Sequence, residues 1–293
     1  MLNVYEQVDR NKRRSALIIF LFILFVTLTG AVISKALDWG WGGLILSLFF
    51  SSFSSLIAYY SGDRLILSLN QAHPVNKSEE PLLYSVVENL SLAAQIPVPK
   101  VYVSETAAAN AFACGRDPQH ASICVTRGLL KLLDKRAELE GVVGHEISHI
   151  KNLDTRLFLI VSILIGGLNI LARFFLNSPS RKKKDTDAGE VFFLLGLILS
   201  ILSPFIGELI KLAISRQREF LADAGSAMLT RQPQGLINAL TKISQSSQTL
   251  PQAVPAFSHF YIVNPFSSSS SLAKLFNTHP PIEERISELK KML

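Results

Sequence analysis

The chain has 293 residues, of which 48% are hydrophobic and 18% charged, and its mean hydropathy is +0.31. An ordinary soluble domain is more polar and more charged, so this composition indicates a membrane protein. The net charge of +6 is not accompanied by any nucleic-acid-binding motif. We therefore expect a membrane as partner and no nucleic acid.

Two long uncharged segments near the N-terminal end predict transmembrane helices. Ser15 to Ser34 and Trp39 to Gly62 carry no charged residue, and each approaches or exceeds the roughly 20 residues that cross a bilayer. Four basic residues between Arg10 and Arg14 precede the first segment. By the positive-inside rule they place the N-terminus in the cytoplasm, so two crossings return the chain to the cytoplasm at Asp63.

A compact α+β unit is expected between Asp63 and Arg156. Its predicted elements are a helix beginning at Ser78 to Pro81 and ending near Gln95, strands at Val101 to Val103, Asn110 to Cys114 and Ala121 to Thr126, and a helix at Ala137 to Asn152. Two amphipathic helices, at about Pro233 to Ser244 and Pro281 to Met292, are expected near the C-terminal end.

The sequence His145-Glu146-Ile147-Ser148-His149 lies on the last helix of that unit. Two histidines four residues apart share one face of a helix, so both imidazoles can bind one metal ion. Glu146 beside them is placed to take a proton from a water molecule, which is the pattern of a zinc peptidase. Gly144 leaves room for a close approach to the site.

A catalytic zinc site needs a third protein ligand. The candidates downstream are His259, His279, Asp154, Glu190, Glu208, Glu219 and Asp223. Glu219 is favoured because it and Asp223 stand four apart on one predicted helix, so one carboxylate can bind the metal while the other accepts a hydrogen bond from a ligand imidazole. The alternative is a solvated helix face held by local ion pairs.

Two further apolar runs, Leu157 to Ala172 and Val191 to Gly207, separate the histidine motif from Glu219. They are interpreted as a second transmembrane hairpin, and a buried or re-entrant pair is the alternative, because the basic run Arg181 to Lys184 would lie on the outer side. The predicted organisation is a cytoplasmic segment with a membrane hairpin (1–62), the first part of a peptidase domain (63–156), the second hairpin (157–213) and the second part of the domain (214–293).

These segments together resemble the HtpX family, the bacterial membrane zinc metalloproteases related to CAAX prenyl proteases. The likeness rests on Asn110-Ala111-Phe112-Ala113, His145 to His149, Ser215 to Asp223, and Thr278-His279-Pro280-Pro281. It implies an α+β, mainly helical, multi-pass protein with about four transmembrane helices and a gluzincin-like metallopeptidase domain. It also implies a bacterial inner-membrane location, a cytoplasmic active site, and removal of misfolded or damaged membrane proteins during stress.

The resemblance also implies roles for individual residues. His145, His149 and Glu219 would bind one zinc ion per chain, Glu146 would be the general base, and Asp223 would orient a ligand histidine. Asn110, Ala111 and Phe112 would form an edge strand that pairs with an unfolded or extended protein substrate, and an ordinary core strand is the alternative. His279 is a candidate for hydrogen-bonding the oxyanion, and a helix-capping or surface histidine is the alternative.

Three other functions are compatible with parts of the sequence. An intramembrane protease would carry its motif inside an apolar run, whereas charged residues such as Glu140 and Lys151 flank the motif here. A CAAX-type prenyl protease shares the chemistry and stays open. A non-catalytic zinc-binding membrane scaffold is disfavoured by the intact Glu146, since a scaffold needs no base beside its ligands.

Overall fold

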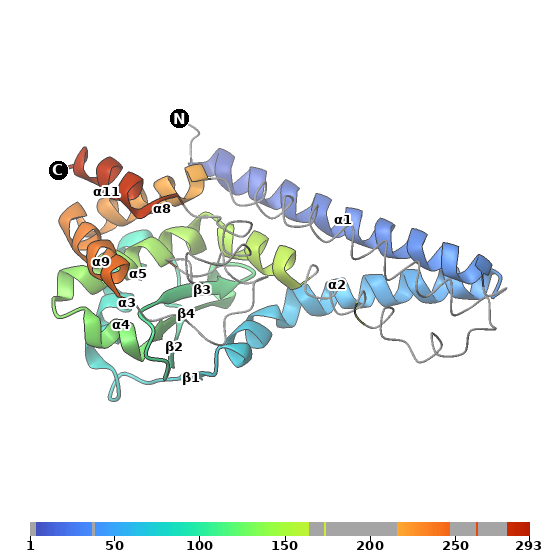
Figure 1. The fold of residues 1–293 in the computed structure, drawn as a ribbon, viewed down its shortest axis with the longest axis horizontal. Coiled ribbons are helices and arrows are strands. Elements are labelled where there is room, and N and C mark those ends of the chain that lie inside the picture. Colours follow the sequence, from blue (N-terminus) through green and yellow to red (C-terminus); the bar gives the residue numbers. More distant parts are fainter. Residues whose placement is uncertain (1–3, 37–38, 164–172, 174–215, 247–261, 263–279) are drawn as a thin grey trace.

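The computed structural model describes residues 4–36, 39–163, 173, 216–246, 262 and 280–293 (Figure 1). The helices with described bounds are α1 (Val4–Ala36), α2 (Trp41–Leu69), α3 (Pro81–Ala94), α4 (Arg127–Leu132), α5 (Arg136–Lys151), α8 (Arg216–Thr230), α9 (Pro233–Gln245) and α11 (Ile282–Lys290). The strands are β1 (Ala72–Pro74), β2 (Lys100–Ser104), β3 (Ala111–Gly115) and β4 (Ala121–Thr126). The prediction of a mainly helical α+β protein is confirmed.

Helices α1 and α2 lie side by side and extend away from the rest of the molecule (Figure 1). Their apolar stretches, Asp9–Ala31 and Trp41–Leu69, are long and apolar enough to cross a membrane, yet only 11% and 17% of an 18-residue apolar part of each is buried in the protein. Large side chains such as Phe20 and Phe49 are 61% and 67% exposed. A core helix would bury these side chains, so both helices are candidate membrane spans, as the sequence predicted.

The second predicted hairpin lies mostly outside the described residues. Residues 154–163 are helical and follow α5 after a two-residue turn at Asn152 and Leu153. The remainder of the run from Leu157 to Ala172, and all of Val191 to Gly207, is not described. A four-span protein therefore stays a prediction.

The described strands form one sheet in the order β1-β2-β4-β3. Strand β4 runs parallel to β2 and antiparallel to β3, and β1 pairs antiparallel with β2. The three predicted strands are confirmed, whereas β1 was missed because its three residues, Ala72 to Pro74, show no apolar alternation. Strand β3 is thus at one edge of the described sheet.

The two faces of the sheet bury two different sets of side chains, as the alternation of a strand requires. One face packs against α5, in a core that α3 and α9 also share, and contributes Val101, Val103, Ala111, Ala113, Ile123 and Val125. The other face packs against the end of α2 and residues 157–161, and contributes Tyr102, Phe112, Cys114 and Cys124. The sheet therefore joins the zinc-motif helix on one side to the membrane hairpin on the other.

Candidate active site

Helices α5 and α8 approach closely because small residues face each other at their contact. A Cβ atom added at Gly144 would lie 2.9 Å from Ser226 Oγ, and one added at Gly225 would lie 2.4 Å from Ser148 Oγ. Ser226 Oγ also donates a hydrogen bond of 2.6 Å to the Gly141 carbonyl. The predicted use of Gly144 for a close approach is confirmed, and this approach brings the two i,i+4 pairs together.

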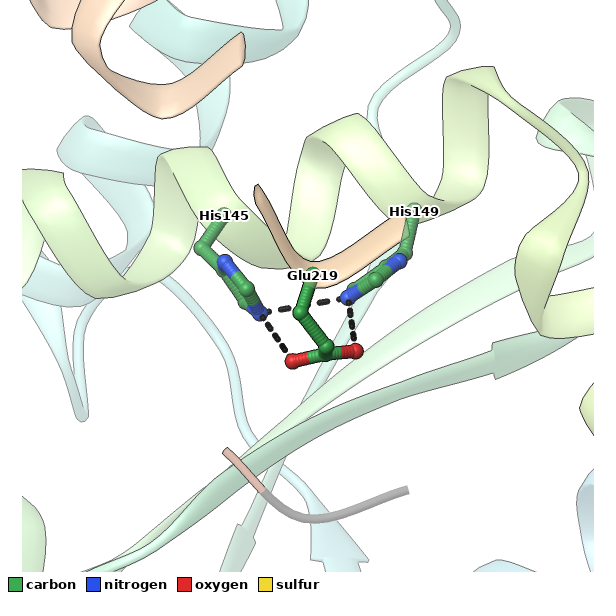
Figure 2. A group of neighbouring side chains, drawn as sticks. All are labelled: His145, His149 and Glu219. Carbon is green, nitrogen blue, oxygen red and sulfur yellow. Dashed lines mark hydrogen bonds and ion pairs between the residues drawn. The ribbon is translucent and has the colours of Figure 1, made fainter. Parts of the chain in front are cut away.

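Three buried side chains converge between these helices (Figure 2). The Nε2 atoms of His145 and His149 are 3.1 Å apart. The Glu219 carboxylate oxygens lie 3.7 Å from His145 Nε2 and 3.5 Å from His149 Nε2. Two ligand atoms bound at 2.0–2.1 Å to one tetrahedral zinc ion would be roughly 3.3 Å apart. The spacing and the donor set of two imidazoles and one carboxylate therefore fit zinc.

Each histidine turns its other ring nitrogen toward a buried carboxylate. His145 Nδ1 lies 2.9 Å from Asp223 Oδ1, and His149 Nδ1 lies 3.0 Å from Asp154 Oδ2. Such contacts fix the ring orientation and the tautomer, leaving Nε2 free to bind a metal. The sequence had offered Asp154 only as a possible third ligand, and the structure places it behind His149 instead.

The backbone after α5 explains how Asp154 reaches its histidine. Leu153 has a φ of 58°, in the left-handed region that costs an ordinary residue roughly 1–2 kcal/mol. This turn ends α5 and a new helix begins at Asp154, which is buried beside His149, five residues earlier. Strain of this kind persists where the surrounding contacts require it.

Arg285 on α11 completes the site, and sequence reasoning missed it. Its guanidinium is buried and donates to both Asp223 oxygens, at 2.8 Å from Nε and 2.6 Å from Nη2. Nη1 donates to the Ile262 carbonyl at 2.9 Å. Burial raises the pKa of Asp223, but the charge and hydrogen bonds of Arg285 outweigh it and lower that pKa to about 2. Asp223 is therefore ionised and fixed between Arg285 and His145.

Glu146, next to His145 on α5, contacts strand β3. Its side chain is buried, and the backbone of Ala113 on β3 hydrogen-bonds it. Burial raises its pKa to about 7, with the Glu219 charge also raising it and His149 opposing. A carboxyl group that titrates near neutral pH can both accept and return a proton.

The predicted substrate-binding residues lie at the start of the edge strand. The Asn110 side-chain oxygen accepts hydrogen bonds from the backbone N–H groups of Ala111 and Ile262, both at 3.0 Å. The Ala111 carbonyl also accepts from Ile262 N–H, at 3.2 Å. Phe112 is buried in the core beneath the sheet. His279, the candidate oxyanion contact, lies outside the described residues, as do His259, Glu190 and Glu208.

Comparisons with known proteins match nearly the whole chain. The profile of Peptidase family M48 matches residues 77–293. A "Protease HtpX homolog" from Dictyoglomus thermophilum is 43% identical over 290 residues, covering 98% of this chain and 94% of that protein. One from Lactobacillus acidophilus is 40% identical, covering 99% and 100%.

Among solved structures, the crystal structure of S. mikatae Ste24p aligns with a TM-score of 0.47 and 18% identity, covering 96% of this chain and 66% of that one. The sequence matches and the geometry at His145, His149 and Glu219 agree. The chain therefore belongs to peptidase family M48, as a membrane zinc metallopeptidase of the HtpX group.

Proposed function

We propose that this chain is a zinc metalloendopeptidase that cuts cytoplasmic segments of misfolded or damaged membrane proteins. One zinc ion per chain is held by His145, His149 and Glu219, whose ligand atoms all lie within 4.8 Å of one another. That convergence of two helices on one point is the observation that carries the proposal. The metal, when bound, supplies Lewis acidity toward water and toward the peptide carbonyl.

Glu146 is the general base and acid in this mechanism. It takes a proton from the attacking water and passes it to the leaving amine, and its pKa near 7 suits both transfers. Asp223 and Asp154 hold the two ligand imidazoles in orientation from behind. The charge of Arg285 keeps Asp223 ionised for that role.

The edge position of β3 supports binding of an extended substrate. Strand β3 is at one edge of the described sheet. Its residue Ala113 forms a backbone hydrogen bond with the Glu146 carboxylate. An extended peptide can add to such an edge through backbone hydrogen bonds, which gives modest sequence preference. Asn110, Ala111 and Phe112 shape the start of this edge, and substrate must compete there with the contacts to Ile262.

The membrane hairpin supports a cytoplasmic site. Near its start α1 contacts the peptidase unit through Asn11, and at its end α2 leads into β1. Both ends of the hairpin therefore lie on the same side as the zinc residues. The basic residues from Arg10 to Arg14 assign that side to the cytoplasm. The similarity to bacterial HtpX homologues supports a location in a bacterial inner membrane.

Two single substitutions test the proposal. Glu146→Gln should retain zinc and lose cleavage by about 10²–10⁴-fold, because the base is removed while the shape is kept. Glu219→Ala should lose zinc, measured by metal analysis after dialysis against a weak chelator. Cleavage by Glu146→Gln at the wild-type rate would contradict the mechanism. Full zinc retention in Glu219→Ala would move the third ligand elsewhere, with His279 the first residue to test.

The substrate class needs its own comparison. Purified enzyme should cut a membrane protein carrying a disordered cytoplasmic tail, and should spare the same tail when it is replaced by a folded soluble domain. A farnesylated CAAX peptide is the matched alternative substrate. Preferential cleavage of that peptide would assign the chain to prenyl-protein processing instead.

A further inference from the structure

Asn11 is a buried polar residue in the helix that leads into the membrane. It lies in α1, within the stretch Asp9–Ala31 that qualifies as a candidate span, and its side chain is 1% exposed. Its neighbours Arg10, Lys12 and Arg13 are exposed. A helix that served only as an anchor would have no need to bury an amide at this point.

Both N–H groups of the Asn11 amide are used in contacts with the chain that follows the zinc helix. Nδ2 donates to the Asn152 carbonyl at 2.9 Å and to Asp154 Oδ1 at 2.8 Å. The other oxygen of Asp154 lies 3.0 Å from His149 Nδ1. The three side chains of Asn11, Asp154 and His149 therefore form a continuous chain from the membrane helix to a zinc-binding imidazole.

The orientation of the amide follows from electrostatics. If the amide were flipped, its oxygen would face the Asn152 carbonyl and the Asp154 carboxylate. Three oxygen atoms that can only accept hydrogen bonds would then repel one another. As placed, Asn11 Oδ1 is buried with no hydrogen-bond partner among the described residues. An unsatisfied buried oxygen costs about 1–3 kcal/mol. The two hydrogen bonds that the amide donates therefore explain why an asparagine is buried here.

Asp154 depends on this donation. It is 1% exposed, and Arg218 Nη1 lies 3.5 Å from Oδ1, which makes a weak hydrogen bond. Buried polar oxygens are held in place by close hydrogen-bond donors. Asn11 supplies the short contact to Oδ1, which leaves Oδ2 directed at His149.

We infer that Asn11 is a positioning residue for the zinc ligand His149, acting through Asp154, so that α1 is part of the metallopeptidase site as well as a membrane anchor. This inference rests on the proposed coordination of zinc by His149. It makes zinc retention depend on the docking of α1 against the end of α5. Loss of a residue that orients a metal ligand typically weakens metal binding by 10–100-fold.

The test uses full-length protein in detergent with Glu146→Gln present throughout, so that no variant digests itself. Asn11→Asp keeps the shape of the side chain but replaces the donor with a carboxylate facing Asp154. Its zinc dissociation constant should rise by about 10–100-fold. Lys12→Ala, at the next and exposed position of the same helix, is the matched control and should bind zinc like the parent protein.

A reciprocal exchange separates positioning from folding. In the double variant Asn11→Asp with Asp154→Asn, the new amide at position 154 can donate to the carboxylate at position 11 while its oxygen accepts from His149. Zinc affinity should recover in part relative to Asn11→Asp alone. The visible spectrum of the Co²⁺-loaded protein should likewise change in Asn11→Asp and return toward the parent spectrum in the exchange, which a defect in helix packing alone would not produce.

The outcomes distinguish this inference from the proposed function. Loss of zinc in Glu219→Ala establishes the coordination on which the inference rests. If Asn11→Asp then binds zinc as tightly as Lys12→Ala, the inference is overturned and the zinc site stands. If Asn11→Asp loses zinc but the double variant Asn11→Asp with Asp154→Asn recovers neither the zinc affinity nor the Co²⁺ spectrum, the inference that Asn11 acts through Asp154 is also overturned.

Discussion

Replacing Arg285 by methionine tests whether the C-terminal helix holds the zinc site together. Arg285 is fully buried and donates two hydrogen bonds, of 2.6 and 2.8 Å, to Asp223. Methionine fills similar apolar volume but leaves the Asp223 carboxylate buried without its cation. Removing one partner of a buried ion pair costs about 3–5 kcal/mol, so the free energy of unfolding should fall by that amount.

The same substitution should also weaken zinc binding. Asp223 lies 2.9 Å from His145 Nδ1, and Arg285 fixes its position. A disturbed orienting carboxylate should lower zinc affinity by about 10–100-fold. In an Asp223→Asn background the buried carboxylate charge of residue 223 is absent. Adding Arg285→Met to that variant should therefore lower the free energy of unfolding much less than Arg285→Met does in the wild type. This coupling distinguishes an ion pair between Arg285 and Asp223 from ordinary packing of the Arg285 side chain.

Unfolding can be followed through the two cysteines, which are both buried in the sheet. Burial raises the pKa of each thiol, so a thiol-specific reagent should label Cys114 and Cys124 only in unfolded molecules. Lys290→Met removes an exposed cation from the same helix and serves as the control. If Arg285→Met unfolds at the same denaturant concentration as Lys290→Met and retains zinc equally, the reasoning is refuted.

Three further outcomes are expected. Burial lowers the pKa of His149, but the Asp154 hydrogen bond and the Glu219 charge outweigh it and raise that pKa to about 9. Zinc must displace this proton below that pH, so the zinc association constant should rise about tenfold per unit between roughly pH 7 and 8.5, and a flat profile would contradict this. A single cysteine at the exposed position Lys135 should resist an impermeant thiol reagent in spheroplasts, and ready labelling there would reverse the topology. The solubilised wild type should cut itself when zinc is added, whereas Glu146→Gln should stay intact on the same gel.

The sequence predicted most described elements of the fold because each carries a local signal. Two uncharged segments predicted α1 and α2, and the predicted strand at Ala121 to Thr126 has the same bounds in the structure. Strand β1 was missed because three residues ending in Pro74 give no periodicity, and their pairing with β2 depends on the end of α2. Helix α2 also continues past the predicted Gly62 to Leu69, because Ile66 and Leu67 in its last turns pack against the sheet.

The metal ligands and their supporting residues differ in how their positions are encoded. His145 with His149, and Glu219 with Asp223, are each fixed by a four-residue spacing on one helix, so the sequence alone could pair them. Asn11 and Asp154 are 143 residues apart, and Arg285 is 62 residues from Asp223. No spacing rule links such pairs, and neither an Asn near the start of an apolar helix nor an Arg on an amphipathic helix is unusual by itself. Each i,i+4 pair is thus local in the sequence, whereas the residues that hold the site rigid come from the first and last described helices. A substitution at either end should therefore act on zinc retention before it acts on the chemistry of Glu146.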